Sequence, residues 1–300
     1  MKVNLADRVN NFIEQQQLPQ TYLGTIAQHY LPLAQWINRQ RTPQQCYFMG
    51  ISGAQGTGKS TLSALLKILL EHEYDCNTAT LSLDDLYLSR TERERLGQKI
   101  HPLMKTRGVP GSHNVAQGVA LFDALNTLQE RQVLALPRFD KANDEPFPKA
   151  QWPVISGPVR VVLFEGWCVG ASACAAAELA EPVNELEAKE DGDGRWRRYI
   201  NKQLETHYQT FFARMEGLIM LQAPDFASIR RWRWQQEEKL VAKHPPGQGS
   251  ALMDRAAIER FIQHFERLTR QNLKQLPPRT DVVFELDKNQ VVVRSHFAKP

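Results

Sequence analysis

The segment Gly53-Ala54-Gln55-Gly56-Thr57-Gly58-Lys59-Ser60 decides the fold of this chain. It follows an apolar run at 47–51 and precedes a helical pattern with leucines at positions 62, 65, 66, 69 and 70. A strand, a glycine-rich loop that ends in Gly-Lys-Ser and an amphipathic helix together predict a P-loop. The alternative is a chance match in a glycine-rich turn, and the flanking strand and helix argue against it.

The residue types of this loop predict that it holds the phosphates of ATP. Glycines allow successive backbone N–H groups to turn towards phosphate oxygens, and the helix N-terminus adds unsatisfied donors. Lys59 can reach the β- and γ-phosphates, and Ser60 can bind Mg²⁺. We therefore expect Gly53 to Thr61 to bind ATP. The loop alone does not say what happens to the phosphate.

The composition is that of an ordinary globular chain. It has 300 residues, of which 42% are hydrophobic and 23% are charged. That length suffices for one large α/β domain with additions or for two small domains. The net charge of +4 is weak, and we expect no nucleic-acid partner. The apolar stretch 159–180 is interrupted by Arg160, Glu165 and Glu178, so we expect no membrane span.

The cysteines and the first residues predict a cytoplasmic protein. Cys46, Cys76, Cys168 and Cys174 lack the spacing of metal ligands, which favours a reducing compartment. The first eight residues lack an apolar signal region.

The hydrophobic pattern divides the chain into two parts. Apolar residues recur at helical spacing through 1–45, which predicts an N-terminal helical extension. Residues 46–300 are expected to form the P-loop domain, with a short strand at 133–137, a loop at 143–158 and a charged insertion at 178–198.

Two acids follow a β-like run at 78–83. Asp84 and Asp85 would stand at the carboxyl end of a parallel strand, where open α/β sheets bind ligands. A phosphoryl-transfer enzyme needs a carboxylate there to orient the attacking hydroxyl and accept its proton. The alternative is a helix N-cap. The position after the P-loop, one helix and one strand favours a catalytic Asp84.

Another acid follows the most continuous apolar run, Val159–Phe164. Unbroken valine and leucine predict a buried strand. An acid at its end, downstream of a P-loop, fits the Walker B position that helps to hold Mg²⁺. Glu165 is therefore a predicted metal ligand, with a structural cap as the alternative.

Two loops carry candidate ligands for a second substrate. Glycine and proline at 105–114 predict a loop that exposes Arg107 and His113, although a lone histidine on a loop is often merely solvated. Arg138 and Lys141 follow the strand predicted at 133–137 and could bind a carboxylate or a phosphate. A surface cluster of ion pairs is the alternative for this second loop.

Arginines alternate with tryptophans at 229–239. In a P-loop kinase this segment would be a mobile lid at about 225–250, with Arg233 at the transferring phosphoryl group and Arg230 and Arg231 beside it. A structural helix and a surface that binds single-stranded nucleic acid are the alternatives.

With these residues identified, the chain resembles the P-loop small-molecule kinases that include uridine kinase, phosphoribulokinase and bacterial pantothenate kinase. It is most similar to the plant-type D-glycerate 3-kinase family. This resemblance covers most of residues 47–286 and rests on four segments in addition to the P-loop. They are Gly111-Ser112-His113, Pro137-Arg138-Phe139-Asp140-Lys141, Leu163-Phe164-Glu165-Gly166-Trp167 and Trp232-Arg233-Trp234-Gln235-Gln236-Glu237.

The resemblance implies an α/β, three-layer P-loop fold with a mainly parallel sheet and helices on both faces. It implies an ATP- and Mg²⁺-dependent kinase that acts on a hydroxyl of a small anionic metabolite, with D-glycerate first. Asp84 falls at the catalytic base, Glu165 at the Walker B acid, and Arg230 or Arg233 in the lid. Pantothenate, a nucleoside or a sugar phosphate as acceptor, and a nucleotide-dependent regulatory ATPase, are the alternatives. The sequence predicts no oligomeric state.

Overall fold

A six-stranded sheet forms the centre of the protein. The computed structural model describes residues 4–42, 44–243 and 255–298. The strand order is β10-β9-β8-β1-β7-β2, and every neighbouring pair is parallel except β9 and β10. The strands are β1 (Tyr47–Gly53), β2 (Thr78–Ser82), β7 (Val161–Gly166), β8 (Gly217–Gln222), β9 (Val282–Leu286) and β10 (Val292–Phe297). The predicted α/β class with a mainly parallel sheet is confirmed.

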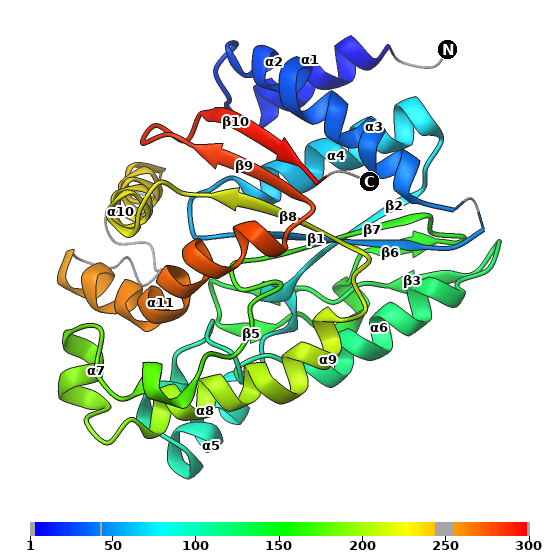
Figure 1. Ribbon diagram of the computed structural model, residues 1–300. Coiled ribbons are helices and arrows are strands. Elements are labelled where there is room, and N and C mark those ends of the chain that lie inside the picture. The colour runs from blue at the N-terminus through cyan, green and yellow to red at the C-terminus, as the bar shows by residue number, and fades with distance from the viewer. Residues whose placement is uncertain (1–3, 43, 244–254, 299–300) are drawn as a thin grey trace.

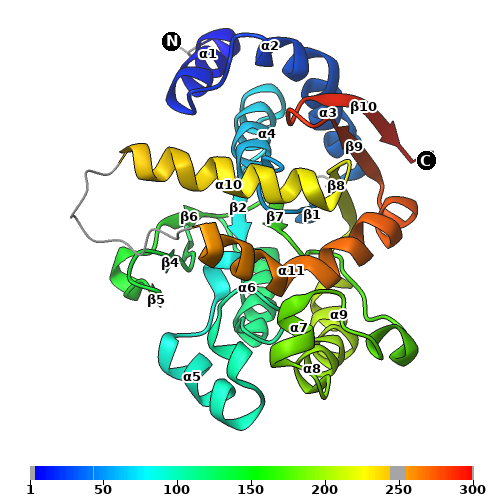
Figure 2. The same ribbon diagram turned by 90° about the vertical axis from the view of Figure 1, so that its left-hand side faces the viewer.

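Helices cover both faces of this sheet (Figure 1). One layer holds α1 (Leu5–Gln15), α2 (Tyr22–Thr25), α3 (Leu31–Gln40) and α4 (Lys59–Tyr74). The opposite layer holds α6 (Val115–Thr127), α8 (Arg195–Gln203), α9 (Gln209–Phe212) and α11 (Arg255–Gln275), with α5 (Arg90–Lys99) and α7 (Glu185–Glu190) further out. A last helix, α10 (Phe226–Lys243), crosses in front of the strands in Figure 2. The protein is a three-layer sandwich, as expected.

The central strands are buried on both faces because each face has its own core. In β1, Phe48 packs in one hydrophobic cluster, while Met49 and Ile51 pack in the other. The same alternation in β7 sends Val162 and Leu163 to opposite faces. This arrangement explains why both strands are continuous apolar runs rather than alternating patterns.

The N-terminal helices share the core on one face of the sheet. Val9 and Ile37 belong to the same buried cluster as Leu65 of α4. Tyr30 lies edge-on to Phe284 of β9, with ring centroids 5.6 Å apart. Helices α1 and α3 therefore supply one wall of the core on this face of the sheet.

Two small two-stranded sheets lie outside the central one. β3 (Val133–Ala135) pairs with β6 (Val154–Ser156), and β4 (Phe139–Asp140) pairs with β5 (Glu145–Pro146). The strand predicted at 133–137 is thus shorter than expected and lies apart from the central sheet. The loop predicted at 143–158 contains β5 and β6. Lys141 lies in the turn between β4 and β5.

Within the described residues, no helix is both long and apolar enough to cross a membrane.

Candidate active site

The P-loop connects the end of β1 to the start of α4. Gly56 has φ +83° and Gly58 has φ +88°, backbone conformations that favour glycine. A Cβ on Gly53 would lie 2.6 Å from Thr57 Oγ1, too close for a side chain. Thr57 Oγ1 donates to the carbonyl of Ala54 at 2.9 Å and closes the loop. The glycines thus allow the tight turn that a phosphate cradle needs.

Two side chains at the start of α4 face the carboxyl ends of the strands. Lys59 Nζ donates to the carbonyl of Ala54 at 3.1 Å. Burial lowers the pKa of Lys59, and the negative charges of Glu165 and Asp84 oppose that effect. Ser60 Oγ donates to Glu165 Oε1 at 3.0 Å, although 105 positions separate the two residues.

This last contact brings together the two predicted metal ligands. A hydroxyl oxygen and a carboxylate oxygen are the donors that Mg²⁺ prefers. Glu165 belongs to β7, the neighbour of β1 and β2, so its position follows from the parallel sheet. Ser60 and Glu165 therefore fit a hard divalent cation, and their role as its ligands stays a prediction.

Asp84 lies on a short 3-10 turn, Leu83–Leu86, directly after β2. Ser82, rather than Asp84, caps this turn by accepting from the Asp84 amide at 3.2 Å. Asp84 Oδ1 accepts from the Tyr87 hydroxyl at 2.6 Å, and Oδ2 accepts from Lys141 Nζ at 2.6 Å. The carboxylate is thus turned towards other side chains, which removes the N-cap alternative for Asp84.

The two neighbouring carboxyls have pKa values displaced in opposite directions. Burial alone would raise the pKa of Asp84, but the Lys141 ammonium and the Tyr87 hydroxyl hold it below its usual value. Burial raises the pKa of Asp85 despite the opposing effects of Arg138 and the Phe139 amide. Environments that displace the pKa values of neighbouring acids in opposite directions give the two groups different protonation behaviour, as in sites with assigned acids and bases.

A cavity of about 460 Å³ joins these groups, and we call it the P-loop cavity. It is lined by residues of the P-loop, by the acid Asp84, and by cationic side chains from three other segments. Its lining residues are Gln55, Gly56, Gly58, Lys59, Ser60, Thr61, Asp84, Tyr87, Arg107, Lys141, Glu165, Trp167, Arg233, Gln236, Phe261 and Phe265. Most of the residues that line this cavity are therefore among those predicted from distant segments of the sequence.

Two of the four predicted acceptor ligands lie elsewhere. His113 is only 5% exposed, so its predicted exposure on a loop is wrong. It lies behind Tyr87, with the rings stacked at 4.8 Å, because Tyr87 and His113 pair as an isolated β-bridge. Arg138 lines a neighbouring cavity and forms an ion pair with Asp85 at 3.1 Å. Arg107 and Lys141 remain as cations of the P-loop cavity.

The three predicted lid arginines separate along α10. Arg233 lines the P-loop cavity and lies over the ring of Phe261, 5.7 Å from its centroid. Arg230 forms a 2.8 Å ion pair with Glu259, and Arg231 donates to the carbonyl of Lys288 at 2.6 Å. Up to Lys243 the predicted lid is one continuous helix, and its 244–250 portion lies outside the described residues.

Several residues of the cavity were not predicted. Tyr87 was not among the predicted site residues, and the acid three positions earlier was the available signal. Phe261 and Phe265 also line the cavity, and nothing in their helical spacing distinguishes them from ordinary core residues. Gln290 donates to the carbonyl of Gly56 at 2.5 Å from the turn between β9 and β10. Nothing in the sequence marks that contact, because it depends on how the last hairpin lies over the P-loop.

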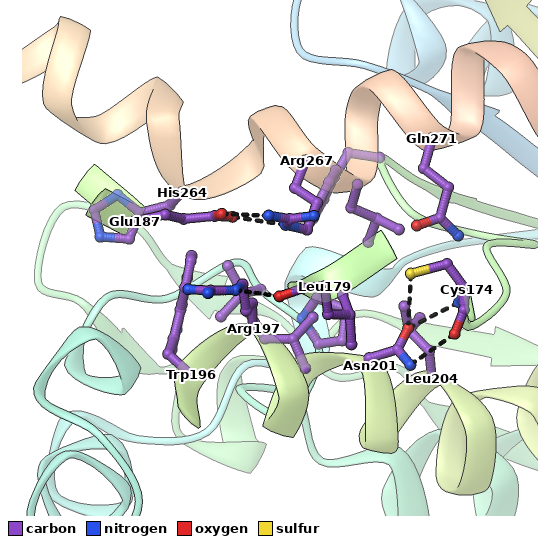
Figure 3. Close-up of a pocket in the computed structure, with 15 residues that line it drawn as sticks. Cys174, Leu179, Glu187, Trp196, Arg197, Asn201, Leu204, His264, Arg267 and Gln271 are labelled. Atoms are coloured by element: carbon purple, nitrogen blue, oxygen red, sulfur yellow. Dashed lines mark hydrogen bonds and ion pairs between the residues drawn. The ribbon is translucent and has the colours of Figure 1, made fainter. Parts of the chain in front are cut away.

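A second cavity lies between the charged insertion and α11, and we call it the insertion cavity (Figure 3). It is small, with a free volume of about 20 Å³, enough for about one water molecule. Arg267 of α11 points to Glu187 of α7 across it, and Arg197 donates through Nε to the carbonyl of Leu179 at 2.7 Å. These contacts tie the predicted charged insertion to the helix that also lines the P-loop cavity.

Comparisons with known proteins point to kinases. No family model matches the chain. The uncharacterized kinase mug58 of Schizosaccharomyces pombe is 28% identical over 242 residues, which are 78% of this chain and 83% of that protein. The chloroplastic D-glycerate 3-kinase of Arabidopsis thaliana is 27% identical over 254 residues, which are 79% of this chain and 52% of that enzyme. This chain thus spans about half the length of the plant relative.

The fold comparison agrees with the sequence comparison. A solved structure of a D-glycerate 3-kinase from Cryptococcus neoformans matches with a TM-score of 0.69 at 23% identity, over 93% of this chain and 100% of that one. The activity that these relatives imply is that of an ATP-dependent kinase that uses a divalent metal and a hydroxyl acceptor on a small molecule. The chain is therefore a P-loop kinase, related to the D-glycerate 3-kinases.

Proposed function

We propose that this kinase transfers the γ-phosphoryl group of ATP to a hydroxyl group of D-glycerate, with Mg²⁺ as its metal. The observation that carries this proposal is the composition of the P-loop cavity. A phosphate-binding loop, a carboxylate and two cations from the acceptor-side loops, Arg107 and Lys141, line the same space. A small acid with a hydroxyl group would use all of these features.

The donor half of the reaction belongs to the P-loop. Its amides and Lys59 would hold the β- and γ-phosphates. Ser60 and Glu165 would hold Mg²⁺, which supplies charge neutralisation at the phosphate oxygens when bound. Arg233 would approach the γ-phosphoryl group from α10, since its side chain lines the cavity.

The acceptor half uses Asp84 as the general base. The acceptor oxygen forms a bond to the γ-phosphorus while the bond from that phosphorus to the bridging oxygen breaks. ADP leaves with the electron pair, and the hydroxyl proton passes to Asp84. The lowered pKa of Asp84 keeps it ionised at neutral pH, so its oxygens can accept a hydrogen bond from the acceptor hydroxyl.

Two basic side chains support an acidic acceptor. Arg107 has a guanidinium that can bind a carboxylate, although Asp144 already occupies part of it at 2.5 Å. Lys141 has an exposed side chain and reaches the base itself. The D-glycerate 3-kinases among the relatives make D-glycerate the first acceptor to test. The four free cysteines fit a cytoplasmic setting.

A phosphorylation screen tests the proposal. The purified chain is incubated with ATP and Mg²⁺ and with D-glycerate, L-glycerate, pantothenate, a nucleoside or a sugar phosphate, and each product is identified by mass spectrometry. We expect D-glycerate to give the highest kcat/KM. A higher value for another acceptor would overturn the substrate assignment. ATP turnover that no acceptor increases would favour a regulatory ATPase. Lys59→Met is the matched control for contaminating kinases.

A further inference from the structure

Both oxygens of the Asp84 carboxylate are occupied by hydrogen-bond donors. Oδ1 accepts from the Tyr87 hydroxyl and Oδ2 from Lys141 Nζ, each at 2.6 Å. A general base must offer an oxygen lone pair to the proton that it takes. Each carboxylate oxygen has two lone pairs, so an acceptor hydroxyl could still approach either one, but the donor already there crowds that oxygen and lowers its affinity for a proton. The more weakly held donor therefore decides which oxygen the hydroxyl reaches.

Tyr87 is held firmly. It is 7% exposed, stacks on His113 and lies edge-on to Phe139 at 5.2 Å. His113 is fixed in turn, because its Nδ1 is 2.6 Å from the hydroxyl of Tyr208, a fully buried residue. Moving the Tyr87 hydroxyl away from Oδ1 would disturb this packed group, so Oδ1 stays occupied.

Lys141 is held loosely. Its side chain is 59% exposed and extends from the turn between β4 and β5. Asp84 is the one side chain with which Nζ forms a hydrogen bond in the described part of the chain. A lysine is a compact charge on a flexible stem, and a partly exposed ion pair is weak. The ammonium can leave Oδ2 without disturbing the fold.

A second cation lies beside Lys141 and provides a destination. Arg107 lines the same cavity, and its guanidinium donates to the Lys141 backbone carbonyl at 3.4 Å. An acidic group bound at Arg107 would lie in the same cavity as the Lys141 side chain. The ammonium could then exchange the Asp84 carboxylate for the acidic group of the acceptor.

We propose that Lys141 is a latch on Asp84 that an acidic acceptor releases. Without acceptor, Lys141 occupies Oδ2. When the acceptor binds, its acidic group draws the ammonium away and its hydroxyl takes the place at Oδ2. This inference rests on the proposed kinase function and adds a way in which the acceptor regulates the base. Lys141 is thus a positioning residue for the base.

The latch would restrain a wasteful side reaction. Water can also attack the γ-phosphorus, with the bond to the bridging oxygen breaking, so that ADP and inorganic phosphate form and one water proton passes to Asp84. With Oδ2 occupied, Asp84 is a poor base for this water. The structure therefore couples activation of the base to the presence of an acceptor.

The test is ADP formation from ATP and Mg²⁺ with no acceptor present. In Lys141→Met, hydrolysis should rise by about two- to fivefold, the gain in unpaired Asp84 when a partly exposed ion pair is lost. Lys141→Ala is a second variant and should show the same rise, because it too leaves Oδ2 without this donor. Lys149→Met is the matched control, because Lys149 is an exposed cation after β5 that lies over Trp152 and outside the P-loop cavity.

A double variant connects the effect to Asp84. In Asp84→Asn/Lys141→Met the rise should disappear, because no base is left to release. Unchanged or slower hydrolysis in both Lys141 variants, or a rise that persists in the double variant, would overturn the latch. The assay needs no acceptor, so it stays informative if D-glycerate is the wrong substrate, an error that the phosphorylation screen would reveal separately.

Discussion

The P-loop cavity and the insertion cavity both contain ion pairs, but they hold their charges differently. In the P-loop cavity, the Lys141 side chain is 59% exposed, and Asp84 is its one side-chain hydrogen-bond partner among the residues that the structure describes. In the insertion cavity, the Arg267 side chain is 16% exposed and that of Glu187 is 1% exposed. Arg267 also donates to the carbonyls of Glu178 and Glu181, at 2.7 and 2.6 Å.

The difference separates charged side chains that can exchange partners with a ligand from those that stabilise the fold. A buried pair whose donors are nearly all used has little to offer a ligand, and the loss of one partner leaves an uncompensated charge in the interior. A partly exposed pair in an open cavity can exchange partners at little cost. Stability measurements should therefore respond to the insertion cavity, and activity measurements should respond to the P-loop cavity.

The largest expected effect comes from breaking the buried pair. Arg267→Met leaves the Glu187 carboxylate buried without its partner and should lower the free energy of unfolding by about 3–5 kcal/mol. Urea denaturation measures this change. Arg260→Met is the matched control, because its pair with Glu190 is 50% and 42% exposed and should contribute about 1 kcal/mol or less. Equal losses for the two variants would contradict the comparison.

Removing the positive charge of Lys59 at the P-loop should lower activity while leaving stability almost unchanged. Lys59→Met takes away a cation that lines the P-loop cavity beside the predicted phosphate site. We expect kcat/KM for phosphoryl transfer to fall by about 10²–10³-fold, as for loss of one group that stabilises charge in a transition state. Thermal unfolding should be almost unchanged. A variant that keeps more than a tenth of the activity would exclude this role for Lys59.

The insertion cavity should also make the protein sensitive to acid. Burial lowers the pKa of His264 to about 4, and the charge of Arg260 adds to that effect. The pKa of an unfolded histidine is about 6.5. The unfolded chain thus binds more protons between these values, so stability is lost as the pH falls from about 6.5 towards 4.

His264→Gln isolates this contribution. Between pH 7 and pH 5 the wild-type protein should lose about 2 kcal/mol more of its free energy of unfolding than the variant does. Denaturation curves at both pH values give the difference. Parallel losses in the two proteins would show that His264 does not cause the acid sensitivity.

The smallest effect is expected from Arg230, at the contact between α10 and α11. Arg230 pairs with Glu259, and both side chains are largely exposed. Arg230→Met should change kcat/KM by less than about fivefold, the upper range for such a pair. Arg233→Met should lower kcat by more than this, because Arg233 lines the P-loop cavity. Both variants are assayed at saturating ATP. A larger loss of activity in Arg230→Met than in Arg233→Met would show that Arg230, rather than Arg233, is the arginine that acts on the phosphoryl group.

Much of the P-loop cavity could be predicted because its parts follow from strand order. Asp84 and Glu165 each lie at the carboxyl end of a strand, and neighbouring parallel strands bring those ends together. His113 could not be placed in the same way, because its burial depends on a β-bridge with Tyr87. The Gln290 contact with Gly56 and the seating of the insertion on α11 likewise depend on packing between distant segments.

The central claim is that Asp84 in this cavity serves phosphoryl transfer to a hydroxyl group. The most direct measurement compares transfer of the labelled γ-phosphoryl group of ATP to D-glycerate by wild type, Asp84→Asn and Asp85→Asn. The account predicts a loss of about 10²-fold or more in Asp84→Asn with unchanged ATP affinity. A smaller loss is expected in Asp85→Asn, because Asp85 pairs with Arg138. Full transfer by Asp84→Asn would contradict the account.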